Sequence, residues 1–240
     1  MSVDTLTPSM QNYLKVIWGL QEWNDAPVSN SAIAESAGVR LSTVSDALRK
    51  LAEQGLIGHA RYGDVSLTAE GREYAISMTR RHRLLETYLV RHLGYQWDEV
   101  HDEADRLEHA VSDELVDRID HALGYPTRDP HGDPIPTRDG EVRRPDAVPL
   151  GEVQAPRRVR IERISDADNE MLQYFASRGL VVDAVLDIGE SAPYSETVEV
   201  TVSDASGQET GSSDGSEPVT LGASAAGAIW VAPIAERGTV

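Results

Sequence analysis

Apolar residues in positions 1–70 recur at the spacing of amphipathic helices. A first helix is expected after the capping-type sequence Thr7-Pro8-Ser9, a second from Val28 to Gly38, and a third from Leu41 to Gly55. Residues 56–68 have the pattern of two short strands around a Tyr62-Gly63-Asp64 turn. Three helices followed by a hairpin predict a winged helix-turn-helix.

After residue 68 the predicted secondary structure changes twice. Residues 69–119 keep a long helical pattern, with Gly94 between two helices, whereas the proline-rich stretch 124–150 is expected to be non-helical and to end in a linker. Beyond residue 152 the pattern predicts a small β module with one short helix and a mobile hairpin loop at 203–217. The expected strands are 158–164, 180–188, 196–202 and 228–234, and the expected helix is 169–177.

The expected fold is therefore mostly α with β, in three domains. Residues 1–73 form the winged helix-turn-helix and residues 74–140 a helical domain. Residues 141–151 form a linker, and residues 152–240 a small β domain.

Composition narrows the function. The chain has no cysteine, which excludes disulfides, zinc ribbons, iron–sulfur clusters and thiol nucleophiles. It has no apolar run of the ~20 residues that a membrane span needs, so we expect a soluble cytoplasmic protein without a membrane partner. The net charge of −18 and the scarcity of lysine are typical of proteins from salt-loving cells, where salt screens a dense carboxylate surface.

Positive charge nevertheless gathers around the third helix. Residues 40–83 hold eight basic and five acidic residues, a local balance of 8 − 5 = +3 in a chain of −18. Val44, Leu48 and Leu51 share one face of that helix and are expected to be buried. The opposite face is small and polar enough for a major groove, so we expect DNA contacts from Arg40, Ser42, Thr43, Ser45, Asp46, Arg49 and Lys50. The alternative is a winged helix used only for protein contacts.

The helical domain carries a second pattern. His82 and Glu86 are four residues apart and so share a helix face. On a following helix, the residues that form one stripe are His101, Asp105, Glu108 and His109. Such a stripe is usually a solvated face. Here it combines imidazoles and carboxylates without lysine, a donor set that suits a divalent transition metal.

These motifs, in this order, resemble the metal-dependent repressors of the diphtheria toxin repressor family, which includes the manganese transport regulators. The resemblance covers residues 5–140 and is weaker for the last ninety residues, which look like the family's SH3-like (FeoA-like) third domain. The residues that carry it are Thr7–Leu14, Thr43–Ser45, Arg81–Glu86, Val100–His109 and the Gly132-Asp133-Pro134-Ile135-Pro136 turn.

The resemblance implies two metal sites per subunit. One would use His82, Glu86 and His101, completed by a third-domain carboxylate for which Asp168 aligns best, with Glu170 next. The other would use Asp105, Glu108, His109 and, from the first helix, Asn12. This chain departs from the family at Asp105, where relatives carry Cys or Glu, and at Asn12, where they carry Met or Asp. Oxygen and imidazole donors favour Mn²⁺ or Fe²⁺ over softer ions, and of these two we expect Mn²⁺ first.

The function that the resemblance implies is repression of metal-uptake genes by a homodimer that binds double-stranded operator DNA when metal is bound. Metal would tie the first helix down and fix the spacing of the two recognition helices. No small-molecule substrate is expected. Three alternatives stay open: a regulator whose sensor has decayed, a His/carboxylate metalloenzyme, and a third domain that serves only protein contacts. The isolated residues His59, His92, His121 and His131 are expected on the surface or in turns.

Overall fold

A computed structural model describes residues 5–23, 27–59, 64–189, 196–203 and 217–234. The chain divides into two compact units, and each is considered by itself. The first unit comprises residues up to Tyr88 together with Glu103–Thr127 and Ile135–Val142. The second comprises Leu89–Asp102, Arg128–Pro134 and the chain from Arg143 onward.

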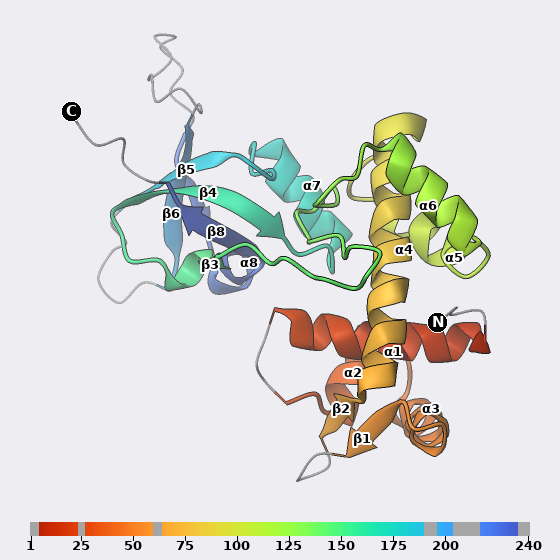
Figure 1. Cartoon of the computed structure of the whole chain (residues 1–240). Coiled ribbons are helices and arrows are strands. Elements are labelled where there is room, and N and C mark those ends of the chain that lie inside the picture. Colours follow the sequence, from red (N-terminus) through yellow and green to blue (C-terminus); the bar gives the residue numbers. More distant parts are fainter. Residues whose placement is uncertain (1–4, 24–26, 60–63, 190–195, 204–216, 235–240) are drawn as a thin grey trace. The chain divides into compact units, whose positions relative to one another are not determined.

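The first unit contains the expected winged helix-turn-helix (Figure 1). Pro8 begins the first helix, and the Ser29 side chain caps the second by accepting a hydrogen bond from Ala32 N–H. The hairpin strands pair antiparallel, with Gly58 opposite Ser66. Tyr62 and Gly63 of the expected hairpin turn lie outside the described residues. The elements are α1 (Pro8–Glu22), α2 (Asn30–Ser36), α3 (Leu41–Glu53), β1 (Ile57–His59) and β2 (Val65–Leu67).

Three further helices confirm the long helical stretch: α4 (Ala69–Leu93), α5 (Val100–Leu107) and α6 (Asp113–Ala122). Gly94 follows α4 with a φ of 76°, a left-handed conformation that ends the helix at little cost. The core of the first unit joins α1, α2 and α3 to α4 through fully buried side chains such as Ile17, Ile33 and Leu51. Within the described ranges, no helix is long and apolar enough to cross a membrane.

The second unit is built on a six-stranded antiparallel sheet in the order β3-β8-β4-β5-β6-β7. Helix α7 (Asn169–Ser177) contributes Leu172 and Phe175 to a core shared with the sheet. A short helix, α8 (Ala223–Gly227), precedes the last strand. The strands are β3 (Val148–Pro149), β4 (Arg157–Ile164), β5 (Val185–Ile188), β6 (Val198–Ser203), β7 (Val219–Leu221) and β8 (Ile229–Pro233), and a 3₁₀ turn spans Leu150–Glu152.

This unit differs from the sequence expectation in two respects. The strand expected at 180–188 begins only at Val185, because the preceding residues form turns and Asp183 has a φ of 69°. The short strands β3 and β7 and helix α8 were not expected, since two- to five-residue elements carry too little periodicity to detect. Most of the expected loop at 203–217 lies outside the described residues.

Candidate metal centre and DNA-reading surface

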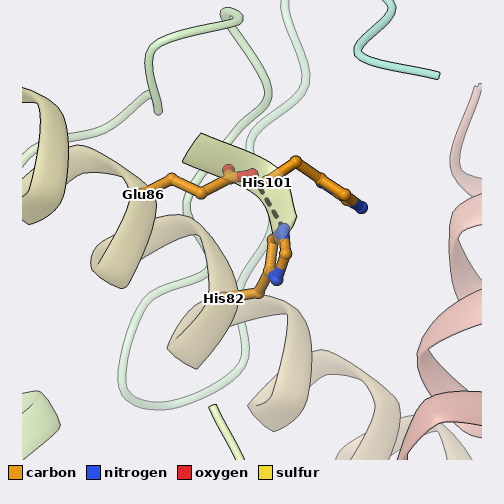
Figure 2. A group of neighbouring side chains, drawn as sticks. All are labelled: His82, Glu86 and His101. Carbon is orange, nitrogen blue, oxygen red and sulfur yellow. Dashed lines mark ion pairs between the residues drawn. The ribbon is translucent and has the colours of Figure 1, made fainter. Parts of the chain in front are cut away.

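His82 and Glu86 form a buried pair on one face of α4 (Figure 2). His82 Nε2 lies 2.8 Å from Glu86 Oε1, as their four-residue spacing predicts. Burial and the charge of Lys15 lower the pKa of His82, but the charge of Glu86 and hydrogen bonds to Asp105 and Glu108 outweigh both. The pKa of His82 therefore stands well above its usual value, and the ring is an imidazolium in the metal-free chain.

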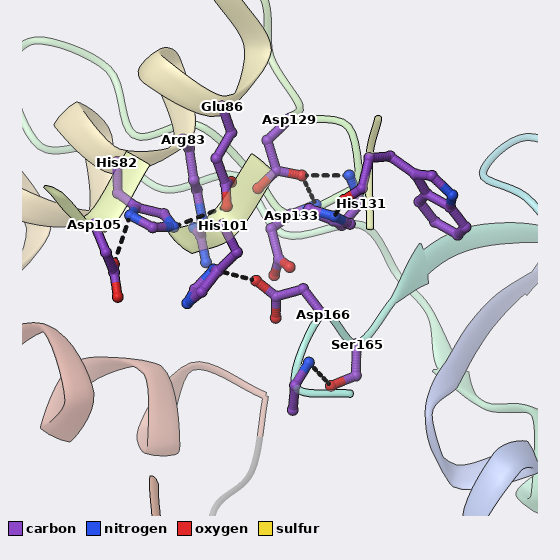
Figure 3. A network of polar contacts seen from close by, with 12 residues as sticks. His82, Arg83, Glu86, His101, Asp105, Asp129, His131, Asp133, Ser165 and Asp166 are labelled. Carbon is purple, nitrogen blue, oxygen red and sulfur yellow. Dashed lines mark hydrogen bonds and ion pairs between the residues drawn. The ribbon is translucent and has the colours of Figure 1, made fainter. Parts of the chain in front are cut away.

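Asp105 on α5 and Glu108 just after it face the other nitrogen of the same ring (Figure 3 shows His82 and Asp105). His82 Nδ1 is 2.6 Å from Glu108 Oε2 and 3.2 Å from Asp105 Oδ1. One ligand atom from each of these three residues lies within 4.8 Å of the others. Glu108 is fully buried, whereas Asp105 is half exposed.

Lys15, from α1, lies among these carboxylates. Its ammonium donates to Asp105 Oδ1 at 2.7 Å and to both carboxylate oxygens of Glu108 at 2.8 Å. Burial opposes the charged form of Lys15, but the charges of Glu108 and Asp105 more than compensate, so the pKa of Lys15 is raised. This cation was not expected from the sequence, although Lys15 lies three residues beyond Asn12 on the same helix.

Gln11 orients the remaining imidazole of the cluster. His109 Nδ1 donates to Gln11 Oε1 at 2.7 Å, and the Gln11 amide nitrogen donates to the Leu6 carbonyl at 3.1 Å, which fixes the amide orientation. His109 Nε2 is then the unprotonated nitrogen, 3.6 Å from Glu108 Oε1. Burial lowers the pKa of His109, so this ring is the neutral form that a metal ligand requires.

Asn12, the ligand expected from the first helix, is exposed on α1. The contacts of α1 with the cluster come from Gln11 and Lys15 instead. The metal role of Asn12 stays a prediction.

The donor chemistry of this cluster fits a divalent cation. Its side chains offer carboxylate oxygens and imidazole nitrogens, a set that suits Mn²⁺ or Fe²⁺ better than softer ions. Carboxylates as crowded as Asp105 and Glu108 also need a positive charge beside them. In the metal-free chain, Lys15 and His82 supply that charge.

The second unit holds the other expected ligands, and Figure 3 shows His101 together with Asp166. His101 Nδ1 lies 3.1 Å from Asp166 Oδ2, a carboxylate that was not among the expected ligands. Asp168, its first choice, is exposed and caps α7 by accepting from Met171 N–H at 3.0 Å, and Glu170 is exposed in the first turn. Because His101 belongs to this unit and His82 and Glu86 to the other, their common site stays a prediction, as do Asp168 and Glu170 as ligands.

His131 differs from the surface position expected for it. It lies in a turn but is 0% exposed, with its ring stacked on Trp97 and Nε2 2.7 Å from the Trp97 carbonyl oxygen. Asp129 accepts from the backbone N–H of His131 and from that of Asp133, both at 2.9 Å. Burial opposes the charged form of Asp166, but a hydrogen bond and charge from His101 and the charge of His131 hold its pKa well below the usual range. His92 and His121 are exposed as expected, and the side chain of His59 lies outside what is described.

Helix α3 presents the expected DNA-reading face. Val44, Leu48 and Leu51 are buried, and the seven expected contact residues, from Arg40 to Lys50, are all exposed. Ser45 Oγ donates to the Leu41 carbonyl oxygen, while Arg49 pairs with Asp46 at 3.4 Å. This arrangement leaves small polar side chains on the outer face of a helix-turn-helix, and their DNA contacts stay predictions.

Comparison with known proteins assigns three consecutive segments. The family models matched are the iron dependent repressor N-terminal DNA binding domain over residues 5–65, the iron dependent repressor metal binding and dimerisation domain over 68–137, and the FeoA domain over 148–233. The chain is 33% identical to the diphtheria toxin repressor of Corynebacterium efficiens over 193 residues, 76% of this chain and 84% of that one. It is 37% identical to the iron-dependent repressor IdeR of Mycobacterium leprae over 134 residues, 56% of this chain and 58% of that one.

The chain is also similar to a solved structure described as a manganese-dependent transcriptional repressor in complex with manganese. The identity is 50%, the TM-score is 0.85, and the match covers 94% of this chain and all of the other. The comparisons give no support to a halophilic origin, which stays a prediction from composition. On its three matched domains and its likeness to the diphtheria toxin repressor of Corynebacterium efficiens, the chain belongs to the family of metal-dependent repressors that includes that protein.

Proposed function

We propose that this chain is a transcriptional repressor that binds operator DNA as a homodimer when Mn²⁺ or Fe²⁺ occupies the cluster of Asp105, Glu108 and His109. One observation carries the proposal. Two side chains of α1, Gln11 and Lys15, contact this cluster, and α1 in turn packs on the two helices of the helix-turn-helix. A cation bound there is thus coupled to the DNA-reading helix through a single helix.

The chain's own residues supply the coupling. Gln11 holds the His109 ring so that Nε2 faces Glu108, which preorganises one donor pair between α1 and the segment after α5. A bound divalent ion would supply the charge that these donors share. Fixing α1 restricts α3, and a dimer whose recognition helices keep one DNA turn, about 34 Å, between them reads a palindromic site best.

A second metal position is part of the proposal. The family resemblance assigns it to His82, Glu86 and His101, with Asp168 or Glu170 from the third domain. Within the second unit, Asp166 is the carboxylate beside His101, so we add Asp166 as a candidate for that role. Because a repressor acts on the chromosome, the proposal also places the protein in the cytoplasm.

Two alternatives from the sequence are a metalloenzyme and a repressor with a decayed metal sensor. The family consists of transcriptional repressors, so the chain is not expected to be an enzyme and the metalloenzyme alternative is set aside. A repressor whose metal sensor has decayed remains an alternative. Such a protein would bind DNA to the same extent with and without metal.

The test measures DNA binding against metal concentration. Operator fragments are first selected from random double-stranded DNA with the full chain in Mn²⁺, and affinity is then titrated with Mn²⁺, anaerobic Fe²⁺ and Zn²⁺ separately. We expect Mn²⁺ or Fe²⁺ to strengthen binding and His109→Ala to remove the response. Equal affinity with and without metal contradicts the sensor function and leaves a metal-independent DNA-binding protein.

A further inference from the structure

Lys15 occupies the position that a cation would take among the carboxylates of the first unit. Its ammonium touches Asp105 Oδ1 and both oxygens of Glu108 within 2.8 Å, and it lies 3.2 Å from His82 Nδ1. His82, Asp105 and Glu108 form a group that could hold a metal ion, and Asp105 and Glu108 are two of the three proposed ligands. A lysine ammonium donates up to three hydrogen bonds, and here its contacts are directed at the cluster.

The contact is built into the fold. The Lys15 side chain is only 17% exposed, and its partner Glu108 is fully buried, so neither charge is stabilised by bulk water. Lys15 and His82 both lie within hydrogen-bond distance of the buried Glu108 carboxylate, so removing Lys15 would take away one of its two positive neighbours.

A divalent ion and this ammonium exclude each other. The ammonium fills the space between the two carboxylates, and an ion bound to the same oxygens would lie within a few ångströms of another positive charge. We propose that Lys15 is an intramolecular competitor of the metal: its ammonium holds Asp105 and Glu108 in the metal-free chain and must be displaced when a divalent ion binds them. This inference rests on the proposed function, because it concerns the same site.

The competition has two opposite consequences for a variant without the ammonium. Lys15→Leu removes the charge and offers no donor atom of its own. The metal-free chain should become less stable, since Glu108 and Asp105 lose a cation. The affinity for metal should rise, since the ion no longer has to displace one.

The experiment measures Mn²⁺ binding to the full chain without DNA, from the electron paramagnetic resonance signal of free Mn²⁺. Lys15→Leu is compared with wild type, with Lys15→Arg, which keeps the cation, and with Arg118→Met, which removes an exposed positive charge from α6. Each is repeated with His109→Ala to identify the site. We expect at least about a tenfold gain for Lys15→Leu, lost with His109→Ala, and little change for the other two.

The outcomes separate the two proposals. If wild type binds Mn²⁺ but Lys15→Leu binds it equally or more weakly, the competition is overturned and the sensor function stands. If wild type binds no Mn²⁺ and Lys15→Leu does, the competition stands and a Mn²⁺-sensing function is contradicted. Should Lys15→Leu fold only with metal, the Mn²⁺ midpoint of folding replaces the affinity, and failure to fold even in Mn²⁺ overturns the competition.

Discussion

Arg83 on α4 and Glu22 at the end of α1 form a buried, two-pronged ion pair. Arg83 Nη1 donates to Glu22 Oε1 at 2.9 Å, and Nη2 donates to Oε2 at 2.5 Å. Both side chains are almost fully buried. The pair therefore fastens the first helix to the long helix at the opposite end of α1 from Gln11.

Breaking this pair from one side should destabilise the chain strongly. Arg83→Met leaves the Glu22 carboxylate buried without its guanidinium, and we expect a loss of about 3–5 kcal/mol of unfolding free energy in urea denaturation. Arg118→Met, in the exposed pair with Glu114, should cost less than about 1 kcal/mol. Similar losses of unfolding free energy in the two variants would show that the buried pair stabilises the chain no more than the exposed pair does.

Gly132 is expected to tolerate no side chain. Its φ is 91°, and a Cβ atom would lie 2.0 Å from the Glu162 carbonyl oxygen, so the turn and β4 would have to separate. Gly132→Ala should lower the thermal midpoint of the second unit by several degrees at least. Gly222→Ala, where nothing lies within 4 Å, is the control. A Gly132→Ala midpoint equal to that of wild type would contradict the close approach.

Removing metal should destabilise the chain in a site-specific way. At a free Mn²⁺ concentration a hundred times the dissociation constant, binding should add about 2.7 kcal/mol to the unfolding free energy, and a chelator should remove it. His109→Ala should reduce this gain, whereas His92→Ala, at an exposed position, should retain it. The comparison is made by urea denaturation with and without Mn²⁺, and equal gains in both variants would argue against His109 as a ligand.

Glu108 should make the metal-free chain sensitive to acid. Burial raises the pKa of Glu108, but the hydrogen bond from His82 and the charge of Lys15 outweigh it, so the folded-state pKa is lowered. A lowered carboxyl pKa contributes stability that is present above the unfolded value of about 4.5 and is lost as pH falls through the folded pKa. The stability difference between wild type and Glu108→Gln should therefore shrink from pH 6 to pH 3. A stability difference that does not change with pH would show that ionisation of the Glu108 carboxyl group does not cause the acid sensitivity.

Direct contacts from α3 should matter for operator affinity. Ser42 and Arg40 are exposed at the N-terminal end of the recognition helix, where base edges are read. The double substitution Ser42→Ala, Arg40→Ala should weaken binding by about 1–3 kcal/mol per lost base contact in a fluorescence anisotropy titration. Arg106→Ala, an exposed arginine outside this helix, should leave affinity within error. Unchanged operator binding by the double variant would refute these contacts.

Local chemistry explains why most helices could be predicted from the sequence. Ser29 caps α2, and Asn169–Ser177 is helical over the range its pattern indicates. The same local chemistry sets the position of Asp168, whose role as a metal ligand stays a prediction. Asp168 serves as the cap of α7, whereas Asp166, two residues earlier, reaches His101. Spacing in the sequence does not distinguish a capping carboxylate from one directed at a distant imidazole.

The cation among the carboxylates could not be placed from periodicity. A helical pattern assigns Lys15 to a face of α1, but which carboxylates meet that face depends on how α1 packs against α4 and α5. The burial of His131 depends similarly on tertiary packing, because its ring is covered by Trp97 from a segment more than thirty residues earlier. The surroundings of both residues are set by contacts between distant parts of the chain, which a local pattern does not contain.

Four consecutive residues of α4 fix the rotational setting of that helix. Arg80 and Arg81 pair with acidic residues of α6, His82 with the carboxylate that follows α5, and Arg83 with α1. Because each residue turns the helix by about 100°, slipping by one position would break all four attachments together. A conformational change in the first unit should therefore leave α4 unrotated. It should proceed by small sliding or tilting of the surrounding helices against α4.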